Sequence, residues 1–268
     1  WNNSKILAYW KYDDATKLGK DSHSWLGRLN NIRTALQGQQ GDRRLRLGIA
    51  GGEWKKMMAD ATARTRFASE VKKIIEQYDF DGVDFDFEWP ANASEYNNYS
   101  ATVIQMRSTL GKYVYFTASL HPVSFKISPE AIDALDFISY QCYGPAVMRF
   151  PYEQFVKDGE AAVAYGIPKN KLVMGVPFYG STGSLIAAYC DFVNDGLATT
   201  NEDTYTYKGN TYTFNSIETI RKKARYVCEE DYAGIMSWDL ATDIDITNNK
   251  SLLKVIKEEF EYYANPTE

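Results

Sequence analysis

Apolar residues along the chain follow two repeats, one with the period of two typical of strands and one with helical spacing. Seven short runs rich in β-branched and aromatic residues predict strands at 5–10, 45–52, 82–89, 113–120, 137–144, 171–180 and 233–240. Segments with helical spacing lie between most of them, at 62–78, 97–111 and 153–166, and another closes the chain at 251–263. Because strands and helices alternate, the sheet is predicted to be parallel.

This series favours an α/β fold of the (β/α)8 TIM-barrel type over an open sheet, because polar and aromatic residues gather at the ends of the strands. The count is one strand short, so either a poorly patterned strand lies within 11–43 or the first strand precedes Trp1. No linker or internal repeat divides the sequence, which predicts a single catalytic domain over 1–268. Before the last strand, "DTYTYKGNTYTF" predicts a small hairpin insertion with a "KGN" turn.

The strand predicted at 82–89 alternates apolar and acidic residues. Side chains two residues apart in a strand point the same way, so Asp84, Asp86 and Glu88 share one face. Val83, Phe85 and Phe87 suit the side covered by helices, which turns the acids toward the barrel interior. Like charges held together there raise at least one pKa and favour sharing of protons.

Two other interpretations of this acidic face are open. It is compatible with the solvated side of an edge strand, although the neighbouring strands read as central ones. Carboxylates also suit Mg²⁺ or Ca²⁺, but no second acidic cluster completes a coordination shell, so neither a metal nor a cofactor is expected.

Composition and charge argue against several classes of function. The 268 residues carry a net charge of -5, and no Lys/Arg run is interleaved with aromatics, which argues against a nucleic-acid partner. No apolar stretch is long enough to span a membrane. The chain starts abruptly near a predicted strand without a signal peptide, which suggests a trimmed or mature form. Its three cysteines are widely spaced and fit buried or half-buried thiols better than a disulfide framework, although one bridge is possible.

The acidic strand, "DGVDFDFEWP", resembles the DxxDxDxE signature of glycoside hydrolase family 18, which contains chitinases and endo-β-N-acetylglucosaminidases. Four further segments resemble strands of that family in the right order: "LGIAGGEW", "FISYQCYG", "KLVMGVPFYG" and "AGIMSWDLATD". The sequence departs from the family pattern at Ile49, where Ser is usual, and at Gly144, where many chitinases carry Asp. The match extends from about residue 45 to the C-terminus.

The resemblance implies a retaining, substrate-assisted reaction, in which the 2-acetamido group of the sugar attacks its own anomeric carbon. Glu88 would protonate the leaving oxygen and then activate water, and its acidic neighbours would raise its pKa. Asp86 would bind the acetamido N–H, and Asp84 would store a proton behind it. Tyr143 would hold the acetamido oxygen, together with Gln141 on the same face.

Further residues are candidates for substrate binding. Trp238 would form the floor under the distorted sugar, although core packing also explains a Trp on a buried strand. Tyr179 is a candidate with core packing as an equal explanation, and Asp81 is one by its place in the acidic motif. Trp54 and Trp89 fit either outer subsites or packing, and Tyr9 and Trp10 are weaker candidates.

We therefore expect hydrolysis of β-1,4-linked N-acetylglucosamine polymers, chitin or chitooligosaccharides, by a monomer that is secreted, periplasmic or at the cell surface. Residues 181–232 leave too little room for a large inserted domain, which predicts a shallow groove and endo cutting. One alternative is an endo-β-N-acetylglucosaminidase acting on the chitobiose core of N-glycans, favoured by the compact chain and by the arrangement of Gln141 and Tyr143. The other is a catalytically silent carbohydrate-binding relative, which normally lacks the Glu found at position 88.

Overall fold

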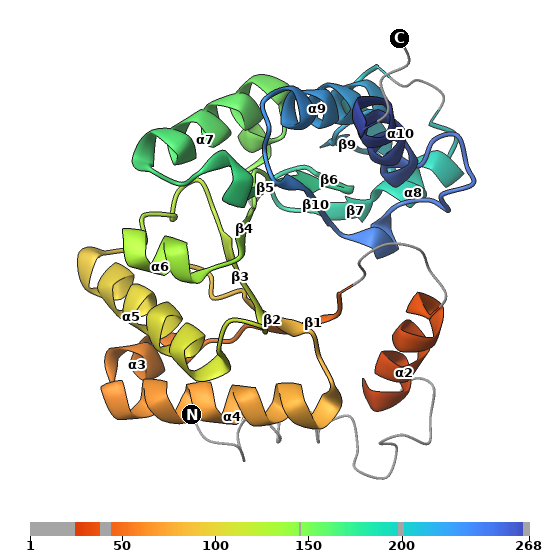
Figure 1. Ribbon diagram of the computed structural model, residues 1–268. Coiled ribbons are helices and arrows are strands. Elements are labelled where there is room, and N and C mark those ends of the chain that lie inside the picture. The colour runs from red at the N-terminus through yellow and green to blue at the C-terminus, as the bar shows by residue number, and fades with distance from the viewer. Residues whose placement is uncertain (1–24, 38–43, 145, 198–200, 265–268) are drawn as a thin grey trace. The chain divides into compact units, whose positions relative to one another are not determined.

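The computed structural model describes residues 25–37, 44–144, 146–197 and 201–264 (Figure 1). Its internal contacts group the chain into two compact units, which are described separately below. Unit 1 comprises residues 1–117 and 133–135, and unit 2 comprises 118–132 and 136–268. Strand β3 (Tyr115–Leu120) begins in unit 1 and ends in unit 2. The single-domain organisation stays a prediction.

Unit 1 alternates helices with strands. In chain order its elements are α2 (Trp25–Leu36), β1 (Arg46–Ile49), α3 (Trp54–Ala59), α4 (Ala61–Tyr78), β2 (Gly82–Phe85), α5 (Ala93–Leu110) and the start of β3. β1 and β2 pair in parallel, with Arg46 opposite Gly82 and Ile49 opposite Phe85. β3 follows β2 in the sheet order.

The ends of the long helices in unit 1 follow from local sequence. The Asp60 side chain accepts a hydrogen bond from the Ala63 N–H at the start of α4, and Asn92 accepts one from Glu95 at the start of α5. Both are N-caps, which satisfy amides that lack a partner within the helix. α5 ends at Gly111, whose φ of 77° suits glycine better than other residues.

The core of unit 1 is an aromatic cluster between the strands and the helices. Phe85 and Phe87 are fully buried, and both contact Phe67 of α4. Tyr99 of α5 packs edge-on against Phe85 and against Trp54 at the start of α3. The strand residues that were predicted to face helices therefore do so, which sets the direction of the intervening acids.

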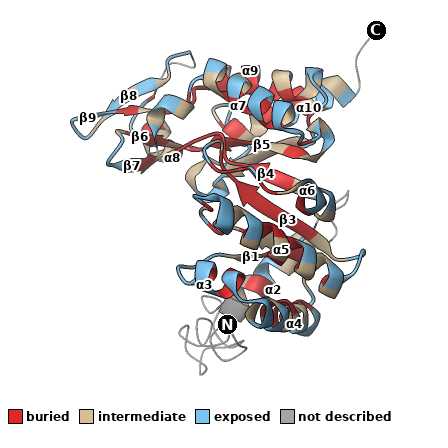
Figure 2. Ribbon diagram, turned by 90° about the vertical axis from the view of Figure 1, so that its left-hand side faces the viewer, coloured by how far each residue is buried: buried red, intermediate tan, exposed pale blue. Residues whose placement is uncertain are grey.

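Unit 2 has parallel strands in the order β3-β4-β5-β10. Its further elements are α6 (Pro129–Ala134), β4 (Phe137–Tyr140), η1 (Val147–Arg149), α7 (Tyr152–Tyr165), η2 (Lys169–Lys171), β5 (Leu172–Pro177), β6 (Tyr179–Ser181), β7 (Ile186–Ala188), α8 (Tyr189–Asn194), β8 (Thr204–Tyr207), β9 (Asn210–Thr213), α9 (Ile217–Glu229), β10 (Gly234–Trp238), η3 (Leu240–Thr242) and α10 (Leu252–Ala264). β5 pairs in parallel with β4 and with β10. Figure 2 shows β3 buried along most of its length, whereas the helices expose one side.

The insertion before β10 forms an antiparallel sheet of its own, in the order β7-β6-β9-β8. The predicted hairpin is present as β8 and β9, and its turn residues Lys208 and Gly209 have φ values of 49° and 76°. Positive φ at both central positions is the geometry of a tight hairpin turn. Phe192 of α8 contacts the rings of Tyr205 and Tyr212, so this sheet has a small aromatic core.

Most sequence-based expectations for the strands agree with the structure. The runs at 45–52, 82–89, 113–120, 137–144 and 233–240 contain β1, β2, β3, β4 and β10. The run at 171–180 contains β5 and the start of β6, because the chain leaves the parallel sheet after Pro177. The run at 5–10 lies outside the described residues, and the described part of 11–43 contains helix α2 instead of a strand. No helix in the described ranges meets the length and hydropathy that a membrane span requires.

Candidate active site

The acidic row follows the end of β2 in unit 1. Burial alternates along the segment, since Val83, Phe85 and Phe87 are completely buried, whereas the acids between them are not. Asp84 is 17% exposed at its side chain, Asp86 is half-buried and Glu88 is exposed. The Asp86 N–H donates to the Ile49 carbonyl at 2.9 Å, so pairing with β1 continues past the end of the strand. The row thus becomes more accessible toward Glu88.

Asp84 has two partners in unit 1 that the sequence did not indicate. Arg46 of β1 places Nη1 3.2 Å from the Asp84 carboxylate. Thr117 of β3 donates its hydroxyl to the same carboxylate oxygen and accepts a hydrogen bond from Arg46. We expected a purely anionic cluster from the motif, but a guanidinium balances the charge of Asp84.

The pKa of the Tyr99 hydroxyl is affected by the negative charge on this strand. Its ring is fully buried, and no partner for its hydroxyl occurs in the described part of the chain. Burial raises the pKa of the Tyr99 hydroxyl well above its usual value, and the charges of Asp84 and Asp86 raise it further. The raised pKa keeps this tyrosine neutral behind the acids.

Two predicted substrate-binding residues of unit 1 have contacts within the protein. Trp54 is 3% exposed and packs its ring against Phe87 and Tyr99, and its assignment to a sugar subsite stays a prediction. The Asp81 side chain accepts the Leu45 N–H at 2.6 Å at the start of β2. Seven residues of extended chain cover roughly 23 Å, so Asp81 lies at the opposite end of the strand from Glu88. Tyr9, like Trp10, lies outside the described residues.

In unit 2 the end of β4 presents Gln141 and Tyr143. Both are almost buried, at 8% and 6% exposure, and the Gln141 N–H donates to the Leu120 carbonyl at 2.8 Å. The Tyr143 hydroxyl lies 3.5 Å from the sulfur of Met236 on β10. A Cβ on Gly175 of β5 would come within 2.8 Å of the Tyr143 ring, so only glycine leaves room for this tyrosine.

Gly144 lies directly beside the Tyr179 side chain in unit 2. A Cβ at position 144 would lie 2.7 Å from the Tyr179 hydroxyl oxygen, and Gly144 has a φ of 27°. The Tyr179 ring packs edge-on against Tyr143 and Phe150, with centroids 6.4 and 5.6 Å apart. The Tyr179 hydroxyl therefore fills the space that a side chain at position 144 would need.

The end of β10 carries an accessible aromatic side chain. Trp238 is 54% exposed, while its carbonyl accepts the Phe178 N–H at 2.8 Å. This exposure does not fit core packing, which was the competing explanation for Trp238. The peptide bonds Glu88–Trp89 and Trp238–Asp239 are both cis.

The sequence model of glycosyl hydrolases family 18 matches residues 4–243. The chain belongs to this family. The resemblance inferred from the motifs is thereby confirmed. Its acidic signature is matched in this sequence by Asp81, Asp84, Asp86 and Glu88.

Chitinases from three different organisms are similar to the chain. "Probable chitinase 2" of Drosophila melanogaster is 23% identical, over 81% of this chain and 60% of the fly protein. A chitinase from Bacteroides thetaiotaomicron has a TM-score of 0.75 at 23% identity, with 89% of this chain and 82% of that chain covered. A class V chitinase mutant from Cycas revoluta in complex with (GlcNAc)3 has a TM-score of 0.67 at 20% identity, over 80% of each chain. These likenesses confirm the (β/α)8 fold.

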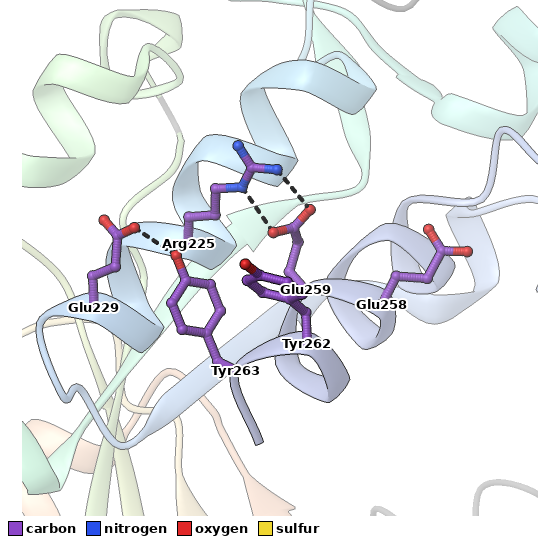
Figure 3. Close-up of a pocket in the computed structure, with 6 residues that line it drawn as sticks. All are labelled: Arg225, Glu229, Glu258, Glu259, Tyr262 and Tyr263. Carbon is purple, nitrogen blue, oxygen red and sulfur yellow. Dashed lines mark hydrogen bonds and ion pairs between the residues drawn. The ribbon is translucent and has the colours of Figure 1, made fainter. Parts of the chain in front are cut away.

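The family 18 chain also has a pocket that is distinct from the predicted site residues. It has a volume of about 370 Å³ and lies between α9 and α10 (Figure 3). Arg225 donates to Glu259 at 2.8 Å, and the Tyr263 hydroxyl donates to Glu229. The side chains that line the pocket thus bond largely to one another. No cluster of three or more potential metal ligands occurs among the residues that the structure describes.

The sequence analysis missed one buried residue of unit 2. His121 follows β3 and is 2% exposed, and its ring lies against the backbone of Tyr143 and Gly144. No local pattern marks it, because Tyr143 and Gly144 are more than twenty residues away along the chain. Arg46 and Thr117 were missed for the same reason.

Proposed function

We propose that this chain hydrolyses β-1,4-linked N-acetylglucosamine polymers as a chitinase, by a retaining, substrate-assisted route. The observation that carries the proposal is the row of Asp84, Asp86 and Glu88, whose accessibility rises toward Glu88 at the carboxyl end of the strand. Active sites of barrel enzymes lie at that end of the strands. Membership of family 18 supports the same chemistry.

In the proposed reaction Glu88 donates its proton to the glycosidic oxygen as the bond to the anomeric carbon breaks. The acetamido carbonyl oxygen of the same sugar forms the new bond to that carbon, which gives an oxazolinium ion and a free leaving sugar. Glu88, now a carboxylate, then removes a proton from water. The water oxygen bonds to the anomeric carbon from the side that the leaving sugar left, and the bond from that carbon to the acetamido oxygen breaks. Two displacements at one carbon restore the original anomer.

The other residues orient the acetamido group. Asp86 accepts the acetamido N–H and balances the positive charge that forms as the oxazolinium ring closes. Arg46 offsets the charge of Asp84, so that the row does not carry three unbalanced negative charges. Tyr143 donates to the acetamido oxygen beside Gln141, and the exposed Trp238 ring provides an apolar face for the sugar.

Gly144 bears on the choice between chitin and N-glycans. The absence of a side chain there would favour a branched substrate if it opened a space, but the Tyr179 hydroxyl occupies that space. This argues for a linear chain of N-acetylglucosamine. The named similarity to chitinases, one of them in complex with (GlcNAc)3, supports the same substrate class. Endo cutting, a monomeric state and a secreted, periplasmic or cell-surface location are parts of the proposal.

Incubation with chitohexaose, followed by chromatography of the products, tests the proposal. We expect the first products to be internal fragments such as dimers, trimers and tetramers. If the monomer alone accumulates first, the endo mode is wrong. If the hexamer stays intact, the hydrolase proposal is wrong.

Two parallel assays test the alternatives. A high-mannose glycoprotein whose gel mobility increases after incubation would favour cleavage of the chitobiose core of N-glycans. Retention on chitin beads without release of soluble sugar at any pH would favour a binding protein. We expect neither result.

A further inference from the structure

His121 lies at the first position of the turn that follows β3. Its backbone pairs with Ser124 across the turn, and its ring is almost completely buried. Nε2 lies 3.1 Å from the Tyr143 carbonyl oxygen and 2.6 Å from the Gly144 carbonyl oxygen. Nδ1 lies 3.2 Å from the Val123 backbone nitrogen. All of these groups belong to unit 2.

These three contacts select one form of the imidazole. The carbonyl oxygens of Tyr143 and Gly144 only accept hydrogen bonds, so Nε2 must carry the proton. The Val123 N–H only donates, so Nδ1 must present its lone pair. The neutral ring protonated on Nε2 satisfies all three contacts. The other neutral tautomer reverses both roles, and the imidazolium loses the bond from Val123.

The charges around His121 favour the same neutral form. Burial is the largest cause that lowers the pKa of the His121 ring, and the charge of Arg149 lowers it further. The carbonyls of Gly144 and Tyr143 and the carboxylate of Asp158 act in the opposite direction, but the net shift is downward. Arg149 and Asp158 pair at 2.8 Å, which partly cancels their two effects.

We propose that His121 is a positioning residue, which holds the carbonyls of Tyr143 and Gly144 through Nε2–H and so fixes the Tyr143 hydroxyl for the sugar. The inference rests on the proposed role of Tyr143 in hydrolysis. Nε2 contacts the carbonyl oxygen of Tyr143 itself, so it holds the backbone from which the Tyr143 side chain extends. A change there moves the hydroxyl relative to the acetamido oxygen, and small displacements of this kind reduce the rate strongly.

Two variants separate the two ring nitrogens. In His121→Gln the amide nitrogen takes approximately the place of Nε2 and keeps a donor for the carbonyls. In His121→Asn the shorter side chain offers an acceptor near the place of Nδ1, but it does not reach the carbonyls. With chitohexaose we expect the Gln variant to stay within about 3-fold of the wild-type kcat and the Asn variant to lose about 10- to 100-fold. Equal kcat values for both variants would overturn the inference.

The Tyr143→Phe background tests whether His121 acts through the tyrosine. Without the hydroxyl there is nothing left to position, so the additional loss caused by His121→Asn should shrink to about 2-fold or less. An undiminished loss in this background would mean that His121 only supports folding, and the inference would be wrong.

The tautomer provides a readout that needs no turnover. The chain has two histidines, so the ¹⁵N spectrum of full-length His23→Gln contains ring signals from His121 alone. Near neutral pH we expect the pattern of a neutral ring protonated on Nε2. A ring protonated on Nδ1, or an imidazolium, would contradict the inference even if the Asn variant fails to fold. If the wild type does not cleave chitohexaose, the proposed function fails independently of this spectrum.

Discussion

The two faces of residues 83–88 differ in burial and in chemistry. On one face Phe85 and Phe87 are fully buried, and their rings pack against each other with centroids 5.2 Å apart. On the other face Asp84 and Asp86 are half-buried and Glu88 is exposed, and Asp84 pairs with Arg46. The same few residues thus carry stability on one side and the proposed chemistry on the other. Substitutions on the two faces should therefore have different effects.

The largest expected effect is on activity. In Glu88→Gln the side chain keeps its size but has no acidic proton, so kcat should fall about 10²- to 10⁴-fold. The free energy of unfolding should stay within about 0.5 kcal/mol of the wild type, because Glu88 is exposed. Steady-state kinetics and urea denaturation measure the two quantities. Glu76→Gln, the same change on the exposed side of α4, is the matched control and should leave kcat unaltered.

The next effect is on stability. Phe87→Ala removes a buried ring that contacts Trp54, Phe67 and Phe85, and should lower the free energy of unfolding by about 3–5 kcal/mol. Denaturant unfolding measures it, with Tyr113→Ala as a control at a side chain that is 87% exposed. A loss below about 1 kcal/mol would mean that this face does not hold the fold together.

Arg46 lies on the neighbouring strand and balances the charge of Asp84 on the acidic face. Arg46→Met should lower the free energy of unfolding by about 1.5–3 kcal/mol, since it leaves Asp84 without its cation. Arg66→Met, at an exposed arginine of α4, is the control. Adding Asp84→Asn to Arg46→Met should recover part of the loss. If the double variant is as unstable as the sum of the single ones, the pair does not interact.

The last expected effect is on the pH dependence of stability, and it comes from a buried charge in unit 2. Lys223 donates to the Phe150 carbonyl and to Asn215, each at 2.7 Å, and burial lowers the pKa of its amine to about 7. Cys142, Asp203, Asp158 and Glu153 act in the opposite direction. Below about pH 7 the amine is protonated in the folded and unfolded states alike, so the cost of burying its charge is fully present.

Between about pH 7 and the ordinary lysine pKa of 10.5, only the unfolded state binds this proton. The free energy of unfolding should therefore rise with pH, by up to about 1.4 kcal/mol per pH unit. Denaturation at about pH 6.5 and about pH 9, compared with Lys223→Met, isolates the contribution of this residue. The variant should have a smaller rise than the wild type. Equal rises would show that Lys223 keeps its charge in the folded state.

Local patterns in the sequence were sufficient for the parallel strands and for the direction of the acids. Phe85 and Phe87 alternate with Asp84, Asp86 and Glu88, and a period of two has only one assignment of faces once the strand is covered by helices. The caps Asp60 and Asn92 and the glycine of the hairpin turn are equally local.

The rest depends on contacts between distant segments. Arg46 and Thr117 reach Asp84 from other strands, and no spacing in the sequence shows which strands are neighbours. Trp54 was taken as the end of a strand, but it starts a helix and packs into the core. A lone aromatic residue carries no sign of whether it faces sugar or protein. The paired β6 and β7 were missed because each is only three residues long.

The configuration of the first product tests the central claim most directly. Proton NMR during the first minutes of chitohexaose cleavage distinguishes the two anomers of the new reducing end before they interconvert. The claim that Glu88 works with the acetamido group of the substrate predicts the β-anomer first, and no signal from Glu88→Gln. An initial α-anomer would indicate direct attack by water and would contradict the account.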